Sequence, residues 1–525
     1  MLKSGLLLIL ITLLYACIED VKPTVESIEK LELTFPQKMK LFLDEPHLLH
    51  IGIDKTAIPY FIDYYKEREY QPRWIEKDTL WTKEATNLKS ILKNKAQFGL
   101  PEKRYDFLKI DTNSIIESEI RLTALFTFLI NDLKKGIFIK DTNLVRPCSI
   151  DTLFHIDSLP NFNTYEPIAH QIIKEGPEDT NYLNFAFALY NYCKKYTLDT
   201  TAYDIKPEKI DTINSLLETK KALFSKGYIQ DMKIDSLNFR KTIEAYQYKN
   251  NLKIDGKIGY NTARMLNEST IHKIARAGIT LDKLRQKEKY DSSYIRINLP
   301  EYILRYIYKD TVISQHRVII GSTKTPTPSL LSEVKKIVLY PYWYVPYSIS
   351  SKEILPHLKK DTTYLKKHNY KVFKRKEEVD VSSINWKKIK ANNFPFNLRQ
   401  DFGPSNSLGL LKIYFYNPYW VYVHDTPNKK LFHLERRALS HGCIRCDSVQ
   451  VLAQKMIFKD RQFIEEDTLN MDTLFSRKEN ISIPLEIKIP IHIEYETVLV
   501  QTKQLIFLED VYGRDEEYLK AWKGK

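Results

Sequence analysis

Residues 440–446 of this chain read Ser-His-Gly-Cys-Ile-Arg-Cys, a stretch that places a thiol directly after a flexible glycine and near an imidazole and a guanidinium. Upstream, residues 421–427 read Val-Tyr-Val-His-Asp-Thr-Pro, and this aromatic and β-branched run predicts a strand that ends at a proline-marked turn. His424 precedes Cys443 by nineteen positions, which is enough for a strand end and a loop to fold back onto the sulfur. We therefore interpret Cys443 as a nucleophile and His424 as its base.

The segment after this stretch predicts a helix that begins close to the thiol. Residues 448–456 have the spacing of an amphipathic helix, with Asp447 or Ser448 as its N-cap. We expect the helix dipole and the neighbouring positive charge to favour the thiolate of Cys443. The N–H groups around Gly442 and Cys443 would point into the same space and could hold a tetrahedral oxyanion.

The sequence before and after His424 and Cys443 predicts a mainly β domain over residues 290–515. Short alternating runs occur at 295–299, 302–308, 314–321, 336–346, 409–416 and 420–424. Residues 481–507 alternate in the same way, and we expect them to return to the same sheet before a short charged helix. Residues 349–396 are lysine-rich and helical, which predicts an insertion that is either a lid or a surface elaboration.

The N-terminal half predicts helices instead. Residues 45–215 carry apolar side chains at helical spacing and are interpreted as a helical scaffold domain. Residues 216–275 form a compact unit with a tight turn at Asp255-Gly256 and a short amphipathic helix after Gly259. The predicted fold class is α+β and multidomain: a helical N-terminal domain and a small three-helix module, followed by a mainly β domain with a helical insertion.

Length and composition agree with several globular units. A chain of 525 residues exceeds what one core usually organises, and 43% hydrophobic with 28% charged residues is typical of a folded protein. The net charge of +14 and the pI near 9.1 favour anionic partners such as a membrane surface or a polyanionic wall. Because no zinc-finger spacing, RNP-type motif or basic helix with interleaved aromatics accompanies that charge, we expect no nucleic-acid partner.

The N-terminus is typical of an exported chain. Lys3 precedes an apolar run that ends at Cys17, and residues 1–17 have the layout of a signal peptide, too short for a membrane span. A cysteine after Leu14-Tyr15-Ala16 resembles the lipobox of bacterial lipoproteins, in which that cysteine carries the lipid anchor. Plain cleavage or an uncleaved anchor remains an alternative, since Tyr15 is bulkier than the lipobox usually has. Residues 18–44 are interpreted as a tether.

Two resemblances add function to these patterns. Tyr246-Gln247, followed from Leu252 by Leu-x-x-Asp-Gly-x-Ile-Gly-x-x-Thr-x-x-x-Leu-Asn, resembles the three-helix peptidoglycan-binding module of bacterial wall enzymes. His424, a loop of under twenty residues and the stretch 440–445 resemble the signature of the L,D-transpeptidases, the YkuD-type cysteine enzymes. The likeness covers roughly 290–515 and extends to the long, YcbB-like branch through Pro341-Tyr342-Trp343, Lys352–Pro356, Leu398–Gln400, Gly403-Pro404, Leu408-Gly409 and His424–Pro427.

The resemblance implies roles for individual residues. Cys443 is the nucleophile and His424 the general base, with the backbone carbonyl of Asp425 orienting the imidazole. His441 and Gly442 shape the oxyanion pocket with Cys443. Ser440 and Arg445 hold the loop or the substrate, and Asp425 and Trp343 are further candidates for substrate contact.

The implied reaction is acyl transfer on peptidoglycan stem peptides. Cys443 would displace the terminal D-residue of a tetrapeptide, and the amine of a second stem would resolve the thioester, which cross-links the third residues of two stems. No metal or organic cofactor is implied, because the thioester stores the acyl group. The implied location is the cell envelope or periplasm, with a lipid anchor to the membrane. The alternatives are an L,D-carboxypeptidase that releases the thioester to water, and a non-catalytic wall-binding scaffold.

The remaining cysteines are less easily interpreted. Cys446 replaces an aliphatic residue of the L,D-transpeptidases, and Cys443-x-x-Cys446 lacks the βαβ context of a redox motif, the histidine of a haem site and the second pair of a zinc site. A reversible disulfide between Cys443 and Cys446 stays a hypothesis for an oxidising envelope. Cys148 and Cys193 either pair or are each buried.

Overall fold

The computed structural model of the chain describes residues 33–523, except 51–52, 54, 77–79, 107, 111–113, 141, 149–165, 197–198, 251 and 462–470. The predicted signal peptide, and with it Cys17, lies outside the described residues. Among the residues described, no helix has both the length and the apolar character that crossing a membrane requires.

The N-terminal half is helical. Its elements are α1 (Phe35–Phe42), α2 (Glu45–His50), α3 (Ile58–Glu67), β1 (Ile75–Glu76), β2 (Leu80–Trp81), α4 (Lys83–Lys93), η1 (Lys95–Phe98), α5 (Ile115–Lys135), α6 (Ile168–Lys174) and α7 (Thr180–Lys195). Side-chain oxygens cap several of these helices: that of Thr82 accepts from the N–H of Ala85, and that of Asp179 from those of Asn181 and Tyr182. Helix α5 is buried along most of its length, which makes it the axis of this half.

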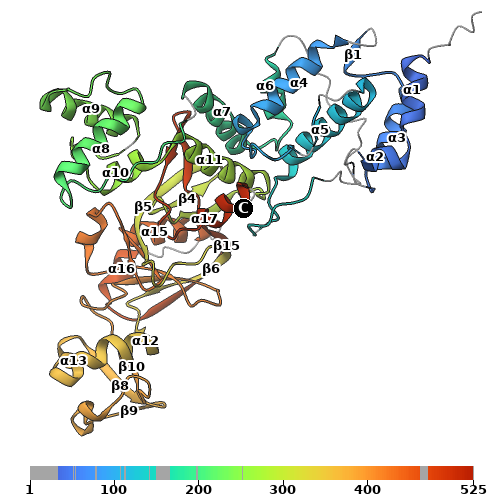
Figure 1. The fold of residues 1–525 in the computed structure, drawn as a ribbon. Coiled ribbons are helices and arrows are strands. Elements are labelled where there is room, and N and C mark those ends of the chain that lie inside the picture. Colours follow the sequence, from blue (N-terminus) through green and yellow to red (C-terminus); the bar gives the residue numbers. More distant parts are fainter. Residues whose placement is uncertain are drawn as a thin grey trace, which may run out of the picture.

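The segment predicted as a tether contains a helix in its described part. Helix α1 buries Phe35 and Met39 against the core of the helical half. Thr34 and Gln37 form a capping box at its start, so the helix begins at a specific residue even though it is short. In Figure 1 α1 lies at the outer end of the helical half.

A second group of helices follows: α8 (Thr212–Ser225), α9 (Ser236–Lys249), α10 (Tyr260–Asn267) and α11 (Thr270–Arg285). The side-chain amide of Gln247 organises the turn before α10, because its oxygen accepts from the N–H groups of Asp255 and Gly256 and its nitrogen donates to Thr262. In Figure 1 helices α8–α10 form a lobe of their own beside the sheet domain.

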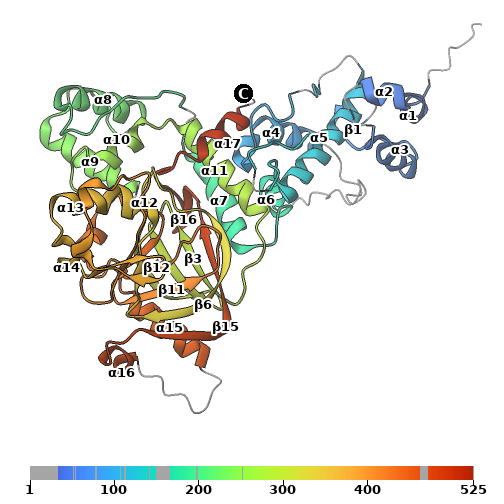
Figure 2. The same cartoon turned by 90° about the horizontal axis from the view of Figure 1, so that it is seen from below.

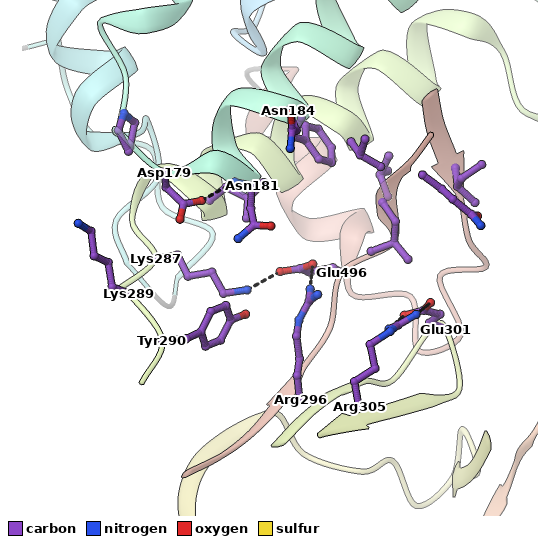
Figure 3. Close-up of a pocket in the computed structure, with 18 of the residues that line it drawn as sticks. Asp179, Asn181, Asn184, Lys287, Lys289, Tyr290, Arg296, Glu301, Arg305 and Glu496 are labelled. Carbon is purple, nitrogen blue, oxygen red and sulfur yellow. Dashed lines mark hydrogen bonds and ion pairs between the residues drawn. The ribbon is translucent and has the colours of Figure 1, made fainter. Parts of the chain in front are cut away.

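Helix α11 joins the parts of the molecule. Arg276, buried in its middle, donates to both carboxylate oxygens of Glu268 and to Asp515 near the C-terminus. Asp282 accepts from the N–H groups of Ile137 and Phe138 at the end of α5. At the following junction Lys287 and Arg296 both pair with Glu496 (Figure 3). One helix therefore contacts the helical half, the sheet domain and the chain end.

The C-terminal half is built on a nine-stranded sheet with the order β13-β5-β14-β12-β11-β6-β15-β3-β4. The strands are β3 (Ser293–Asn298), β4 (Ile303–Tyr308), β5 (Thr311–Gly321), β6 (Leu330–Leu339), β11 (Leu411–Phe415), β12 (Val423–His424), β13 (Ala438–Ser440), β14 (Ile444–Cys446) and β15 (Ile481–Glu494). Because β4 also pairs with β5, the sheet curls and closes on itself. Helix α15 (Val449–Arg461) buries its apolar face in the same core, and the short helix α16 (Met471–Ser476) follows it.

A smaller unit lies between β6 and β11. It comprises β7 (Trp343–Tyr344), α12 (Tyr347–Ile349), the π-helix η3 (Ser350–Ile354), α13 (Leu355–Lys360), α14 (Tyr364–Lys367), β8 (Tyr370–Lys374), β9 (Glu377–Glu378), η4 (Val381–Ser383), η5 (Trp386–Lys388) and β10 (Asn397–Gln400). Strands β7, β10, β8 and β9 form their own sheet, and the unit has its own core around Trp386 and Leu398. It projects away from the large sheet in Figure 1, and α12–α14 lie beside that sheet in Figure 2.

The chain end departs from the sequence expectation. Strand β15 returns to the large sheet as expected, but β16 (Val498–Gln501) and β17 (Gln504–Phe507) pair only with each other. Val498, Leu505 and Phe507 of this hairpin are buried with the helical half instead, and so are Leu519 and Trp522 of α17 (Asp515–Trp522). The prediction that all of 481–507 joins one sheet is therefore wrong for the hairpin. The predicted fold class is confirmed: a helical N-terminal region precedes a mainly β domain in an α+β, multidomain protein.

Candidate active site

The alternation of side chains along three neighbouring strands assembles the site. Strand β12 pairs in parallel with β14, with Val423 opposite Ile444 and His424 opposite Arg445. Val423 and Ile444 point into the core, so His424 and Arg445 face the other side of the sheet. Cys443 lies two residues before Arg445 and Tyr422 two before His424, hence on that same side. The structure thus brings the predicted thiol and imidazole to adjacent strands.

The imidazole of His424 is buried and stays neutral. Only 4% of the residue is exposed, and burial lowers its pKa to about 3, helped by the positive charges of Arg445 and Lys412. The backbone groups of Asp425 and Leu408 oppose this by favouring the charged ring. Nδ1 has no hydrogen-bond partner among the described residues. A neutral imidazole with a free ring nitrogen can accept a proton, but so low a pKa makes it a weak base in the free protein.

The thiol of Cys443 is partly buried, and burial raises its pKa. The side chain of Tyr422 hydrogen-bonds to it, and Lys412 and Arg445 add positive charge, all of which act in the opposite direction. The sulfur also lies 3.9 Å from the carbonyl oxygen of Trp420. The expectation that the thiolate is favoured is therefore wrong for the free protein, because desolvation is the largest influence on this group.

The helix after the motif does not reach the thiol. Helix α15 begins at Val449, and the whole of strand β14 separates it from Cys443. Since the dipole effect fades within about one turn of a helix end, α15 gives the thiolate no support, contrary to expectation. The positive charges that face Cys443 come from strands: Lys412 on β11 and Arg445 on β14.

The turn at 440–443 is held by its own serine. The hydroxyl of Ser440 donates to the carbonyl of Cys443 (2.5 Å) and accepts from the N–H of Gly442 (3.1 Å). Gly442 has φ of +116°, a conformation that favours glycine. Because its N–H is occupied, Gly442 is not a free oxyanion donor here. The N–H groups of His441 and Cys443 make no hydrogen bond within the described residues.

A second loop, between β5 and β6, holds this turn in place, and sequence reasoning missed it. The hydroxyl of Thr327 donates to the carbonyl of Gly442 (2.8 Å) and accepts from the N–H of Gly321 (2.8 Å). Thr325 donates to the carbonyl of Ser440. Tyr512, near the chain end, donates to the carbonyl of Gly321. The only sequence signal for this loop is the run Thr325-Pro326-Thr327-Pro328, whose prolines mark a turn between two predicted strands.

The other predicted residues lie at the rim or beneath the site. Asp425 is buried, and its carboxylate accepts from the N–H of Leu410 and pairs with Lys429, so it holds the adjoining loop. Trp343, on β7 of the smaller unit, hydrogen-bonds with Tyr422. His441 is exposed, and its Nε2 lies 2.7 Å from Glu353 of η3. The smaller unit therefore contacts the site at two points.

Cys446 lies on the opposite face of the sheet from these groups. It is fully buried in the core of the large sheet, opposite Val318 of β5, and burial raises its pKa well above the ordinary value. Three positions separate it from Cys443, so the two side chains point to opposite faces of the strand. The geometry contradicts a disulfide between them, and Cys446 replaces an aliphatic core residue as a small apolar one. Cys148 and Cys193 are also unpaired.

The closed, mainly β domain that contains Cys443 and His424 coincides with a match to a known family. Residues 292–461 match the family model of the YkuD L,D-transpeptidase catalytic domain, and residues 60–154 match that of a scaffold domain. The C-terminal half of this chain therefore contains a YkuD L,D-transpeptidase catalytic domain.

One relative is a Haemophilus influenzae protein that carries the name "Putative L,D-transpeptidase". It is 33% identical over 224 residues, which are 42% of this chain and 45% of that protein. The match thus spans less than half the length of this relative.

Two solved structures resemble this chain only loosely. The Ldtfm-avibactam carbamoyl enzyme is 12% identical, with a TM-score of 0.17 over 39% of this chain and 49% of that one. A "Fused Zn-dependent amidase/peptidase/peptodoglycan-binding domain-containing protein" from Clostridium acetobutylicum is 12% identical, with a TM-score of 0.15 over 56% and 99%. Scores this low carry no argument about the fold.

Proposed function

We propose that this chain is an acyltransferase of the cell wall that uses Cys443 to form cross-links between the third residues of two peptidoglycan stem peptides. The observation that supports the proposal is the pairing of β12 with β14, which puts His424 and Cys443 on one face of the sheet with Tyr422 in contact with both. The YkuD L,D-transpeptidase domain over 292–461 supports the reaction class.

In the first step the sulfur of Cys443 attacks the carbonyl carbon between the third and fourth residues of a tetrapeptide stem. The free nitrogen of His424 takes the thiol proton as the S–C bond forms, and the oxyanion is stabilised by the unoccupied N–H groups of Cys443 and His441. The proton then passes to the leaving nitrogen, the C–N bond breaks and the terminal D-residue departs. A thioester on Cys443 remains.

In the second step the amine of another stem attacks the thioester, and His424 accepts its proton and returns it to the sulfur. The new amide bond links the two stems and the thiol is restored. Because the raised pKa of Cys443 keeps it a neutral thiol before substrate binds, proton transfer and attack occur together.

The charge of the site supports an anionic substrate. Arg445 and Lys412 flank Cys443 and make no hydrogen bond or ion pair with other described residues. Stem peptides carry carboxylates, which such groups bind. Trp420, whose backbone carbonyl lies 3.9 Å from the sulfur, is 81% exposed and offers an apolar surface. We include Arg445, Ser440, Asp425 and Trp343 in the substrate site, and we propose that the insertion over residues 349–396, part of the smaller unit that contacts the site through Glu353 and Trp343, acts as a lid instead of a surface elaboration.

The domain arrangement and location belong to the same proposal. We assign residues 45–215 as the scaffold, 216–275 as a peptidoglycan-binding module of the YcbB-like branch and 290–515 as the catalytic domain. The protein would act in the cell envelope, anchored to the membrane through lipid on Cys17.

Incubation with tetrapeptide-bearing muropeptides, followed by mass spectrometry, tests the proposal. Loss of the terminal residue together with dimer formation and a covalent adduct on Cys443 is expected, and Cys443→Ala and His424→Ala should abolish all three. Tripeptide monomers without dimers would identify an L,D-carboxypeptidase instead. Intact substrate and an unmodified Cys443 would leave only the wall-binding scaffold.

A further inference from the structure

A cavity of about 530 Å³ lies between the helical lobe and the hairpin of the chain end, away from the strands that carry Cys443. Helix α7 forms one wall, α9 and the residues after α8 form another, and α11 with β17 closes the bottom. These elements come from four separate regions of the sequence. Cavities at such junctions are where proteins most often bind ligands.

The walls of this cavity, which we call the lysine pocket, are basic and aromatic. Asp199 is the one acidic residue among those that line it. The lysines and tyrosines that line it are Lys195, Lys226, Lys249, Lys273, Lys503, Tyr192, Tyr196, Tyr228 and Tyr246. Asp199 is already engaged, since it pairs with Lys226 (3.6 Å) and accepts from the N–H of Thr201. The pocket therefore presents an excess of positive charge.

Lys273 is a buried cation without an anionic partner. Only 5% of the residue is exposed, and its ammonium makes no hydrogen bond or ion pair with any residue that the structure describes. The carboxylate whose charge acts on it, Glu268, is already bound by both Arg276 and His272. Burial accordingly lowers the pKa of Lys273 to about 7, further reduced by Lys226, Arg264 and Arg276.

Tyr246 lines the same cavity and carries a second polar group without a partner among the described residues. The residue is 2% exposed, and its hydroxyl has no hydrogen-bond partner within the described part of the chain. A buried, unpaired hydroxyl or ammonium destabilises a fold, and phenylalanine or methionine in these positions would avoid that cost. Two such groups that line one cavity indicate that a ligand completes their hydrogen bonds.

Another cavity, of about 690 Å³, differs in this respect (Figure 3). Five of its charged residues pair with one another: Lys287 and Arg296 bind Glu496, and Arg305 binds Glu301. These groups are therefore satisfied without a ligand, whereas Lys273 and Tyr246 of the lysine pocket are not.

We propose that the lysine pocket is a binding site for the carboxylate of a peptidoglycan stem peptide, separate from the catalytic cleft. Lys273 and Tyr246 bind the carboxylate, and the surrounding tyrosines contact the aliphatic part of the stem. The proposal rests on the proposed function for the identity of the ligand, because a wall polymer offers many such carboxylates. It gives the chain a second binding site for the polymer, which raises the effective concentration of stems at Cys443.

The test uses the full chain with Cys443→Ala, so that no ligand is consumed, and a disaccharide-tetrapeptide as the probe. Hydrogen exchange read by mass spectrometry reports the two sites separately, through peptides of α9 and the β16–β17 hairpin for the pocket and through residues 440–446 for the catalytic cleft. We expect protection at the pocket. Lys273→Met should raise the apparent Kd there about tenfold or more, and Tyr246→Phe about threefold.

Lys241→Met, an exposed lysine on α9, is the matched control and should change nothing. Because Lys273→Met and Tyr246→Phe remove uncompensated polar groups, both should have a Tm equal to or above that of the parent, which confirms folding. A probe whose carboxylates are converted to amides should not protect the pocket.

The proposal is overturned if the pocket shows no protection, if Lys273→Met binds as the parent does, or if the amidated probe binds equally well. Protection by inorganic phosphate at the same concentration would also overturn it, because the site would then be a general anion site. Failure of the proposed function has a different signature: the pocket is protected, residues 440–446 are not, and the wild-type chain forms no cross-links.

Discussion

At the scale of single residues, burial and, after it, the charge of Arg445 set the protonation of the base. Arg445 stands opposite His424 on the neighbouring strand and, with burial, holds the pKa of that imidazole down at about 3. The acid limb of kcat/KM should therefore lie well below the ordinary histidine pKa of about 6.5. Arg445→Met removes the repulsion, so the pKa of His424 rises and the acid limb should move up by about one pH unit.

The position of the limb, not the absolute rate, is the measurement, since Arg445 is also a candidate for substrate contact. Lys430→Met removes an exposed positive charge from the loop after His424 and should leave the limb in place. An unmoved limb in Arg445→Met would mean that burial alone sets the protonation of His424.

Tyr422 is the residue we expect to support the thiolate. Its hydroxyl hydrogen-bonds to Cys443, while its ring lies against His424 (centroids 5.6 Å apart) and under the ammonium of Lys412 (3.7 Å). Tyr422→Phe keeps the ring and loses the hydroxyl, so the pKa of Cys443 should rise further and kcat should fall about tenfold. The rate of iodoacetamide alkylation of Cys443 against pH measures this, and its midpoint should move to higher pH. Tyr414→Phe serves as the control, because Tyr414 lies on the same face of β11 as Lys412.

At the scale of elements, the loop before β6 positions the nucleophile. Thr327 bridges the N–H of Gly321 and the carbonyl of Gly442, so it ties β5 to the catalytic turn. Thr327→Val keeps the shape but leaves both groups unpaired, and kcat should fall about tenfold with KM little changed. Thr327→Ser retains the hydroxyl and should restore most of the activity. A loss of equal size in both variants would assign Thr327 to packing instead.

Helix α11 carries the contact between the two halves of the molecule. A Cβ on Gly278 would lie 2.3 Å from the ring of Trp522 on α17. Gly278→Ala should therefore lower the free energy of unfolding by about 1–3 kcal/mol and detach the chain end first. Thermal unfolding of Gly278→Ala, Trp522→Leu and the double variant forms a mutant cycle, in which the double variant should be more stable than the sum of the single effects implies. Additive effects would contradict the contact.

The strands were predictable wherever the alternation of side chains was local. The run that ends at His424 shows its period of two in consecutive residues, and β12 lies there. The same alternation in 498–507 predicts strands correctly but not their partner, because the packing of Phe507 against Tyr192 of α7 decides it. Local pattern identifies a strand, and distant residues choose its sheet.

In the candidate site, too, some features are predictable from local sequence and others depend on distant residues. Cys443 and His424 are candidates from residue types and spacing alone, because reactive groups are visible in a sequence. The raised pKa of Cys443 could not be found, because it depends on burial by chain segments far away in the sequence. Thr327 and Tyr512 were missed for the same reason: each acts on a residue more than 100 positions distant.

At the scale of the whole molecule, the two halves should respond to acid with opposite signs. In the sheet domain burial lowers the pKa of His316, His424 and His492 below the unfolded value of about 6.5. Between pH 6.5 and about 4.5 the unfolded state then binds more protons than the folded one, so the stability of this domain falls as the pH falls.

In the helical half the sign is reversed. Burial raises the pKa of Glu119 on α5 to about 7, and it also raises that of Asp282. The folded state therefore binds more protons than the unfolded state as the pH falls from about 7 towards 4.5, which adds stability. Segment-resolved hydrogen exchange at pH 7 and pH 5, corrected for intrinsic rates, should show protection lost in β11–β14 and kept or gained in α5. Glu119→Gln should remove the gain in α5 and leave the loss in the sheet. Parallel loss in both halves would show that they unfold as one cooperative unit, whose net protonation hides the opposing contributions.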